Sequence, residues 1–226
     1  MTPGYLGPRH QPLALADPAK GLEDLKPLAA DFDARVALLE EIERHFAKDY
    51  PARATEAHKT TLARAARLIR SDKAKVFDLD REPKAARDAY GDTTFGRGCL
   101  LARRLVEAGV PFVRVGRAWW DSHGQNFETH AEMVPELDHV MATLIDDLTE
   151  RGMMDDVMIV TLAEFGRTPT INASLGRDHF ASAWSSTITG CGIKRGSVYG
   201  KTDPKGATVT AEEADAGSLF ATIYAA

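Results

Sequence analysis

The sequence has little cysteine, no long apolar run and no excess of positive charge, and each of these absences excludes a class of protein. Only Cys99 and Cys191 occur in 226 residues, so neither a zinc-knuckle spacing nor a disulfide framework exists. The longest apolar runs, such as residues 157–163, are far below the roughly 18 residues that a membrane span needs, and no signal-peptide pattern opens the sequence. The 28 Lys and Arg against 33 Asp and Glu give a net charge of −5, which excludes an electrostatic footprint for nucleic acid.

A hydrophobic content of 44% with 27% charged residues is enough to bury a core, so the chain is neither disordered nor a small disulfide-stapled scaffold. The first ten residues are rich in proline and glycine and indicate an exposed loop. Because such a loop is an unusual start for a domain, we expect the sequence to be a portion of a longer protein.

Hydrophobic periodicity predicts three helices in the first half of the chain. The first, over 31–48, has apolar residues every three or four positions: Phe32, Val36, Leu39, Ile42 and Phe46. A second helix starts near Pro51 and runs to about residue 70. The third, over 95–108, stops at Gly109, a residue that favours the left-handed cap of a helix.

The hydrophobic pattern of the second half of the chain predicts strands that alternate with helices. A β-branched and aromatic run over 111–116 predicts a strand, and a helical pattern over 127–151 follows it. Residues 157–163 are almost all apolar, as in a strand that is covered on both faces of a parallel sheet. Strand, helix and strand in this order predict a βαβ unit, with a further strand over 184–189 and a helix over 216–225. The predicted class is α/β, a mainly parallel sheet covered by helices with an N-terminal helical layer.

Polar residues follow two of the predicted strands. Open parallel sheets bind their ligands beyond the carboxyl ends of the strands, so these residues are candidates for a site. Asp121 and His123 follow the first strand, and Glu164 and Arg167 follow the apolar strand. Asp178 and His179 come about a dozen residues later. If these side chains converge, the carboxylate and imidazole set suits Zn²⁺, Mn²⁺ or Fe²⁺ better than ions that prefer thiolates.

Each of these residues also has an ordinary structural interpretation, and the sequence leaves both open. Asp121 and His123 fit a turn that caps the following helix, and Glu164 fits a surface carboxylate. Arg167 fits a partner of a nearby acid, and the adjacent Asp178 and His179 fit a hydrogen-bonded loop. Two other chemistries are excluded: the glycines around Arg97 do not form a complete phosphate loop, and no Gly-x-Ser-x-Gly elbow of an esterase occurs.

Three ordered motifs, at residues 120–124, 163–169 and 176–179, resemble those of the "domain of unknown function 1501" family. Its members are sulfatase-like proteins of the alkaline phosphatase superfamily. Residues 3–9, 95–109 and 201–203 also resemble this family, so the resemblance covers nearly the whole chain.

The resemblance implies an alkaline-phosphatase-like α/β sandwich with a two-metal site for phosphate or sulfate esters. Residues 1–226 would be the C-terminal portion of one such domain, with a mostly helical segment over 1–90 and the βαβ core with the metal site over 91–226. The nucleophile would lie in an N-terminal half that this sequence lacks, and the complete protein would be exported. One departure is that Glu164 is followed by Phe165, where the superfamily typically has Asp followed by His.

The resemblance also implies roles for the residues. The implied metal ligands are Asp121, His123, Glu164, Asp178 and His179, which would hold zinc, manganese, calcium or iron, and Asp178 also fits a residue that orients His179. Arg167 would bind a substrate oxygen. The leading expectation is therefore a metal-dependent hydrolase acting on a small-molecule or carbohydrate ester, present as an incomplete and by itself inactive chain. The alternative is a non-catalytic binding or scaffold protein on the same fold.

Overall fold

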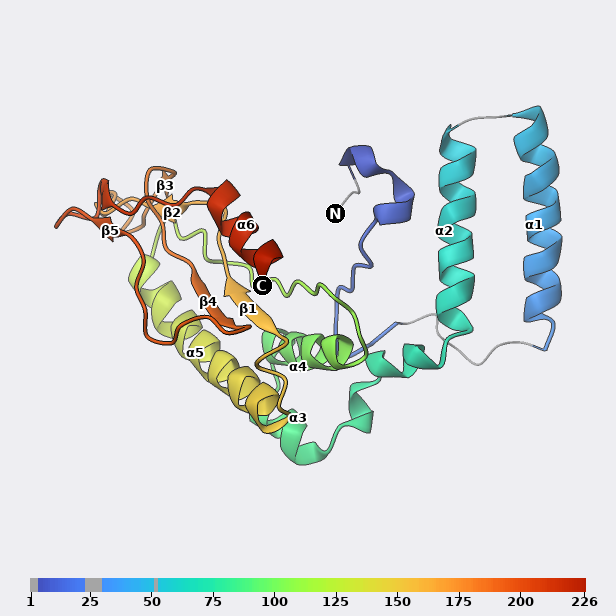
Figure 1. Ribbon diagram of the computed structural model, residues 1–226, viewed down its shortest axis with the longest axis horizontal. Coiled ribbons are helices and arrows are strands. Elements are labelled where there is room, and N and C mark those ends of the chain that lie inside the picture. The colour runs from blue at the N-terminus through green and yellow to red at the C-terminus, as the bar shows by residue number, and fades with distance from the viewer. Residues whose placement is uncertain (1–3, 23–29, 51–52) are drawn as a thin grey trace. The chain divides into compact units, whose positions relative to one another are not determined.

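The computed structural model describes residues 4–22, 30–50 and 53–226 of the chain (Figure 1). The chain forms two compact units, residues 1–113 and residues 114–226, called here the N-terminal and the C-terminal unit. It is a mixed α/β protein whose strands form small antiparallel sheets. No helix formed by the described residues is both long and apolar enough to cross a bilayer.

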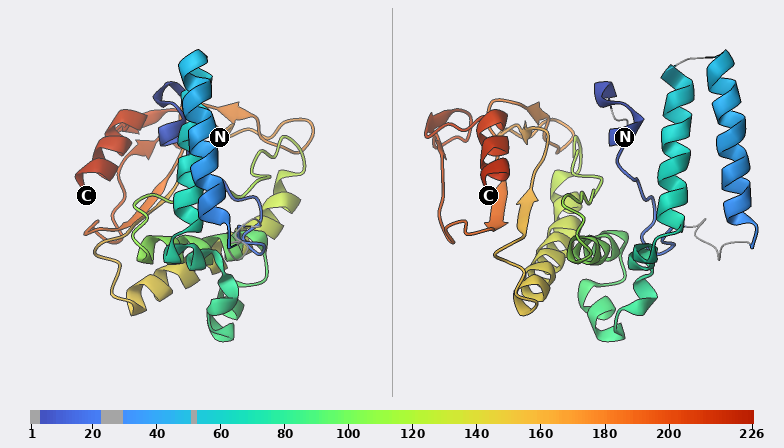
Figure 2. Two further views of the ribbon diagram at one scale, coloured as in Figure 1. Left: turned by 90° about the vertical axis from the view of Figure 1, so that its right-hand side faces the viewer. Right: turned by 45° about the vertical axis from the view of Figure 1, so that its right-hand side comes forward.

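Two long helices form a hairpin in the N-terminal unit (Figures 1 and 2). The predicted helix over 31–48 is confirmed as α1, Phe32–Asp49, and the second helix is α2, Arg53–Ile69. The predicted start at Pro51 lies outside the described residues. Although the predicted apolar spacing of α1 is present, Ile42 and Phe46 remain more than half exposed, so this part of the apolar stripe is not buried in the described structure.

The core of the N-terminal unit lies around α4, Thr94–Glu107, which confirms the third predicted helix. Helix α3, Lys84–Tyr90, and the 3₁₀ turns η3, Asp72–Phe77, and η4, Leu79–Arg81, pack near it. Gly96 stands in the first turn of α4 because a Cβ there would lie 2.0 Å from the carbonyl oxygen of Tyr90. Gly96 thus serves close backbone packing.

A buried ion-pair network ties α4 to the preceding turns. The side chain of Arg103 is only 1% exposed and donates to Glu82, with a nitrogen–oxygen distance of 2.6 Å, and to Glu107 at 3.0 Å. Arg104 also donates to Glu82, and its Nε donates to the carbonyl oxygen of Val76 at 2.7 Å. Two guanidinium groups therefore neutralise one half-buried carboxylate, which offsets the cost of burying each charge.

The C-terminal unit contains one long helix and three two-stranded antiparallel ribbons (Figure 1). The predicted long helix is confirmed as α5, Asn126–Glu150, and buries residues at helical spacing: Met133, Val140, Leu144 and Leu148. The ribbons pair β1, Met158–Thr161, with β4, Thr187–Gly190; β2, Gly166–Arg167, with β3, His179–Phe180; and β5, Lys201–Thr202, with β6, Val209–Ala211. The predicted last helix is confirmed as α6, Ala216–Ala225.

The predicted βαβ unit does not form among the described residues. Residues 111–116 form no strand and pair with no strand of the described structure, so no described strand precedes α5. The predicted strands over 157–163 and 184–189 do form as β1 and β4, but they run antiparallel, with Ile159 opposite Thr189. The apolar run of β1 is half-buried throughout rather than covered on both faces. Among the described residues, β1 pairs with β4 only.

Candidate metal centre

The loop that carries Asp121 and His123 is held by the start of helix α5. The hydroxyl of Ser122 is buried and donates to Oδ1 of Asn126, with an oxygen–oxygen distance of 2.7 Å. The carbonyl oxygen of Ser122 accepts from the backbone N–H of Arg177 at 2.9 Å. Since Ser122 is fixed on both sides, the flanking Asp121 and His123 side chains point away from it and are exposed.

A second loop packs directly on this first loop through Asn172. The amide nitrogen of Asn172 donates to the carbonyl oxygen of His123 and to Oδ1 of Asp178, both at 3.0 Å. Its side-chain oxygen accepts from the backbone N–H groups of Ser174 and Gly176, both at 2.9 Å. A Cβ at Gly176 would lie 2.0 Å from the carbonyl carbon and oxygen of His123, so only glycine fits this contact.

The β2–β3 ribbon brings the remaining polar residues to the same place. Arg167 pairs with His179 in the ribbon register. At the next position, the backbone N–H of Thr168 donates to the carbonyl oxygen of Asp178 at 2.9 Å. The guanidinium of Arg177 donates to the carbonyl oxygens of Thr168 and Pro169 at 2.6 and 2.7 Å, which closes the far end of the ribbon.

Three donor atoms meet where these segments converge, and they form a nearly equilateral triangle. Oδ1 of Asp121 lies 3.0 Å from Nε2 of His123 and 3.0 Å from Nε2 of His179. The two Nε2 atoms lie 3.1 Å apart. The three side chains are 48–59% exposed, so an ion or a small molecule reaches the triangle from solvent.

Asp178 lies behind His123 and sets the orientation of its ring. Nδ1 of His123 donates to Oδ1 of Asp178 at 2.9 Å, an assignment that follows because a carboxylate only accepts. With the proton on Nδ1, the lone pair of Nε2 points into the triangle. A carboxylate behind an imidazole in this way is the usual support of a metal-bound histidine. The sequence allowed Asp178 to orient His179, whereas the structure places it against His123.

Hydrogen bonds stabilise both carboxylates in their ionised form. The hydrogen bond from Arg167 to Asp121, followed by the one from His179, lowers the pKa of the Asp121 carboxyl below its usual value. The pKa of Asp178 is lowered by its hydrogen bond from His123 and then by that from Asn172. Both carboxylates are therefore charged acceptors at neutral pH.

The donor set fits a divalent cation. An ion about 2.1 Å from each donor needs the donors about 3.0 Å apart in octahedral and about 3.4 Å apart in tetrahedral coordination, which brackets the triangle. One carboxylate with two imidazoles suits zinc, manganese or iron, whereas calcium prefers six or more oxygen ligands. Without an ion, the same atoms satisfy one another only if one Nε2 carries a proton.

The structure brings together four of the five predicted metal residues and separates the fifth. Asp121, His123 and His179 offer ligand atoms that lie within 4.8 Å of one another. Glu164 is exposed, lies outside this group and makes no hydrogen bond or ion pair with the described residues. The next residue, Phe165, packs its ring on that of His179, with 4.3 Å between ring centroids.

Residues that sequence reasoning missed build the support of the site. Asn172 and Gly176 hold the loop against His123, and the buried pair of Ser122 and Asn126 fixes the other side. A signal for Asn172 was present, because an Asn side chain in a loop commonly accepts from the backbone N–H two residues later, as Asn172 does from Ser174. Nothing in the local sequence marks Gly176 as a contact with a residue 53 positions earlier.

The sequence model of the family described as "Protein of unknown function (DUF1501)" matches residues 1–226. The chain belongs to the DUF1501 family. Searches of curated proteins and of solved structures found no match for it. This match confirms that the three motifs belong to the DUF1501 family. In this DUF1501 chain, those motifs supply Asp121, His123 and His179 of the triangle.

Proposed function

We propose that Asp121, His123 and His179 bind one divalent cation and that the complete protein uses this site to hydrolyse phosphate or sulfate esters. The observation that carries the proposal is the triangle of three donor atoms, two from the loop before α5 and one from β3, with sides of 3.0–3.1 Å. The likeness of the motifs to those of sulfatase-like enzymes supports the same chemistry. A bound cation would supply a Lewis acid that draws electron density from the ester oxygens.

The chain's own residues have distinct roles in this proposal. Asp121 and His179 are ligands, and His123 is a ligand whose tautomer Asp178 sets. Arg167 donates to Asp121, and its guanidinium carbon lies 5.7 Å from the centroid of Phe165. Its side chain is 20% exposed. In the proposal, its remaining N–H groups donate to an oxygen of a substrate beside the triangle.

One observation favours the second candidate, a binding or scaffold protein that does not turn over its ligand. The hydroxyl nearest to the ligands in sequence is that of Ser122, and it is buried and donates to Asn126. Ser122 therefore cannot attack a substrate in this arrangement. Within the chain described here, the geometry supports binding of a cation and an oxyanion more directly than it supports a nucleophilic step.

Measuring the metal content of the protein and its variants tests whether Asp121, His123 and His179 bind a cation. The purified protein is loaded with zinc or manganese, dialysed, and analysed by plasma mass spectrometry. We expect about one ion per chain in the wild type, and loss of the ion in His179→Ala and in Asp121→Ala. His139→Ala removes an exposed imidazole of α5 and is the matched control, and Glu164→Gln tests the residue that lies outside the triangle.

Equal metal content in His179→Ala and His139→Ala would refute the site. Loss of the ion in Glu164→Gln would show that Glu164 joins the site and that the arrangement described here is incomplete. The metal-loaded complete protein is then assayed with aryl phosphate and aryl sulfate esters. Hydrolysis that Arg167→Lys lowers supports the hydrolase, and metal binding without hydrolysis supports the binding protein.

A further inference from the structure

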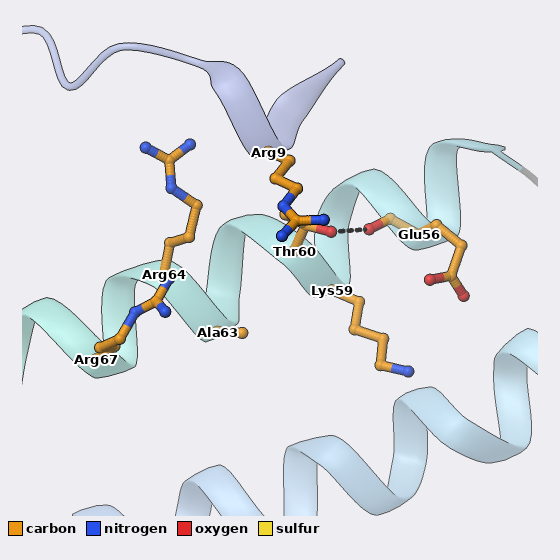
Figure 3. Close-up of a pocket in the computed structure, with 7 residues that line it drawn as sticks. All are labelled: Arg9, Glu56, Lys59, Thr60, Ala63, Arg64 and Arg67. Carbon is orange, nitrogen blue, oxygen red and sulfur yellow. Dashed lines mark hydrogen bonds between the residues drawn. The ribbon is translucent and has the colours of Figure 1, made fainter. Parts of the chain in front are cut away.

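A cavity of about 470 Å³ lies in the N-terminal unit, between the 3₁₀ turn η2, Pro8–His10, and helix α2 (Figure 3). It belongs to a different unit from the candidate metal centre. Basic side chains dominate its wall, and the residues that line it are Arg9, Glu56, Lys59, Thr60, Ala63, Arg64 and Arg67.

Two hydrogen bonds from Arg64 hold the segment around η2 against α2, and the cavity lies between them. Its guanidinium donates to the carbonyl oxygens of Pro8 and Gln11, both at 2.7 Å. These bonds hold the first residues of the chain against a helix that lies more than 50 positions later. They place Arg9 over α2, where Figure 3 shows its guanidinium next to Thr60.

Helical spacing gathers further cations on the same part of α2. Thr60, Arg64 and Arg67 follow one another at intervals of four and three residues, so they lie on one helix face. Figure 3 shows Arg64 and Arg67 on the turns beyond Thr60, while Lys59 extends from the side of the helix that is turned away from η2. The face of α2 below η2 therefore carries the guanidinium groups of Arg64 and Arg67.

The cations that line the cavity outnumber the acids, and no described carboxylate forms an ion pair with Arg9 or Arg67. The lining holds four cations and one acid, Glu56, whereas the whole chain carries a net charge of −5. The side chains of Arg9 and Arg67 make no hydrogen bond or ion pair with any described residue. The carboxylate of Glu56 points away from the guanidinium groups in Figure 3, so it does not neutralise them.

We propose that this cavity binds the oxyanion of a phosphate or sulfate group. Guanidinium groups present paired N–H donors that match the oxygens of these anions, and two unpaired guanidinium groups favour a doubly charged ligand over a singly charged one. Arg9 and Arg67 bind the anion, and Arg64 positions Arg9. The inference goes beyond the proposed function, since none of its residues belongs to the metal centre.

The test titrates inorganic phosphate and inorganic sulfate separately into the full chain and measures binding by calorimetry at low ionic strength. The chain carries His123→Ala and His179→Ala, and the buffer contains a chelator, so that anions held at the metal centre do not contribute. We expect saturable binding of at least one of the two anions, and about five-fold or more weaker binding in both Arg9→Gln and Arg67→Gln. Added salt weakens the binding further.

Arg44→Gln is the matched control, because it removes one exposed charge from α1 without touching the cavity. Both Arg9 and Arg67 are exposed, so their replacement leaves folding intact. Binding that Arg44→Gln weakens as much as Arg9→Gln overturns the proposal, as does acetate binding of equal strength or a lack of saturation. A preference for phosphate or for sulfate identifies which of the two oxyanions the cavity takes.

Discussion

Replacing Gly176 by alanine tests whether the contact between the two loops positions His123. A Cβ at this position would lie 2.0 Å from the carbonyl carbon and oxygen of His123 and 2.3 Å from the backbone nitrogen of Gly124. All three are backbone atoms, so no side-chain rotation relieves the clash. To reach ordinary contact at about 3.5 Å, the loops must move apart by about 1.5 Å.

A displacement of this size has two consequences. Overpacking at a buried backbone contact lowers the free energy of unfolding by about 1–3 kcal/mol, which shifts the urea midpoint by about 1 M. It also opens the donor triangle, whose sides are 3.0–3.1 Å, because His123 moves with its backbone. We expect metal affinity to fall by about 10- to 100-fold, the range found when the support of a metal ligand is lost.

The assay is urea unfolding followed by circular dichroism, together with a metal titration of the folded protein. Gly116→Ala is the control, since a Cβ at this exposed position meets no atom within 4 Å. A Gly176→Ala protein with the urea midpoint and the metal affinity of Gly116→Ala would refute the assignment of this contact. Lower stability with unchanged metal affinity would refute only the link to His123.

Three further outcomes are expected in the N-terminal unit. Gly96→Ala places a Cβ 2.0 Å from the carbonyl oxygen of Tyr90, so its urea midpoint should fall by about as much as that of Gly176→Ala, with no change in metal content. Arg103→Ala leaves Glu82 with one cation in a half-buried site and should lower the free energy of unfolding by about 3 kcal/mol, whereas the exposed Arg44→Ala should change it by less than about 0.5 kcal/mol. Burial raises the pKa of Glu82, but hydrogen bonds and charge from Arg103 and Arg104 outweigh burial, so its pKa lies below the usual value. Its contribution is therefore fully present above the unfolded-state pKa of about 4.3 and is lost as the pH falls through the lower folded-state pKa. Urea midpoints measured from about pH 7 to about pH 3 should fall less steeply in Glu82→Gln than in the wild type, and equal slopes would contradict this sign.

Helices were the part of the fold that the sequence predicted well. The predicted spans over 31–48, 95–108 and 127–151 agree with α1, α4 and α5 to within about one residue at each described end. Helix formation depends on spacing within a few turns and on caps such as Gly109, which has a positive φ of 91°. These signals are local, so they can be read from the sequence alone.

Strand pairing was predicted less well, because it depends on residues far apart in the chain. The apolar run over 157–163 predicts a strand correctly, but its composition does not state which strand lies beside it. Its partner β4 runs antiparallel, and Gly190 at the end of β4 lets the chain approach to where a Cβ would lie 1.9 Å from the carbonyl oxygen of Val157. The run over 111–116 is apolar enough for a strand but finds no partner among the described residues.

By itself, the sequence determined which carboxylates and imidazoles the three motifs contain and in which order they occur. It also determined membership of the DUF1501 family. The tertiary structure alone decided which of them meet. It joins Asp121, His123 and His179, sets Asp178 behind His123 and leaves Glu164 outside. The reason is physical: residue types are local properties, whereas a metal site needs donor atoms about 3 Å apart, and only the packing of one loop on another sets such distances.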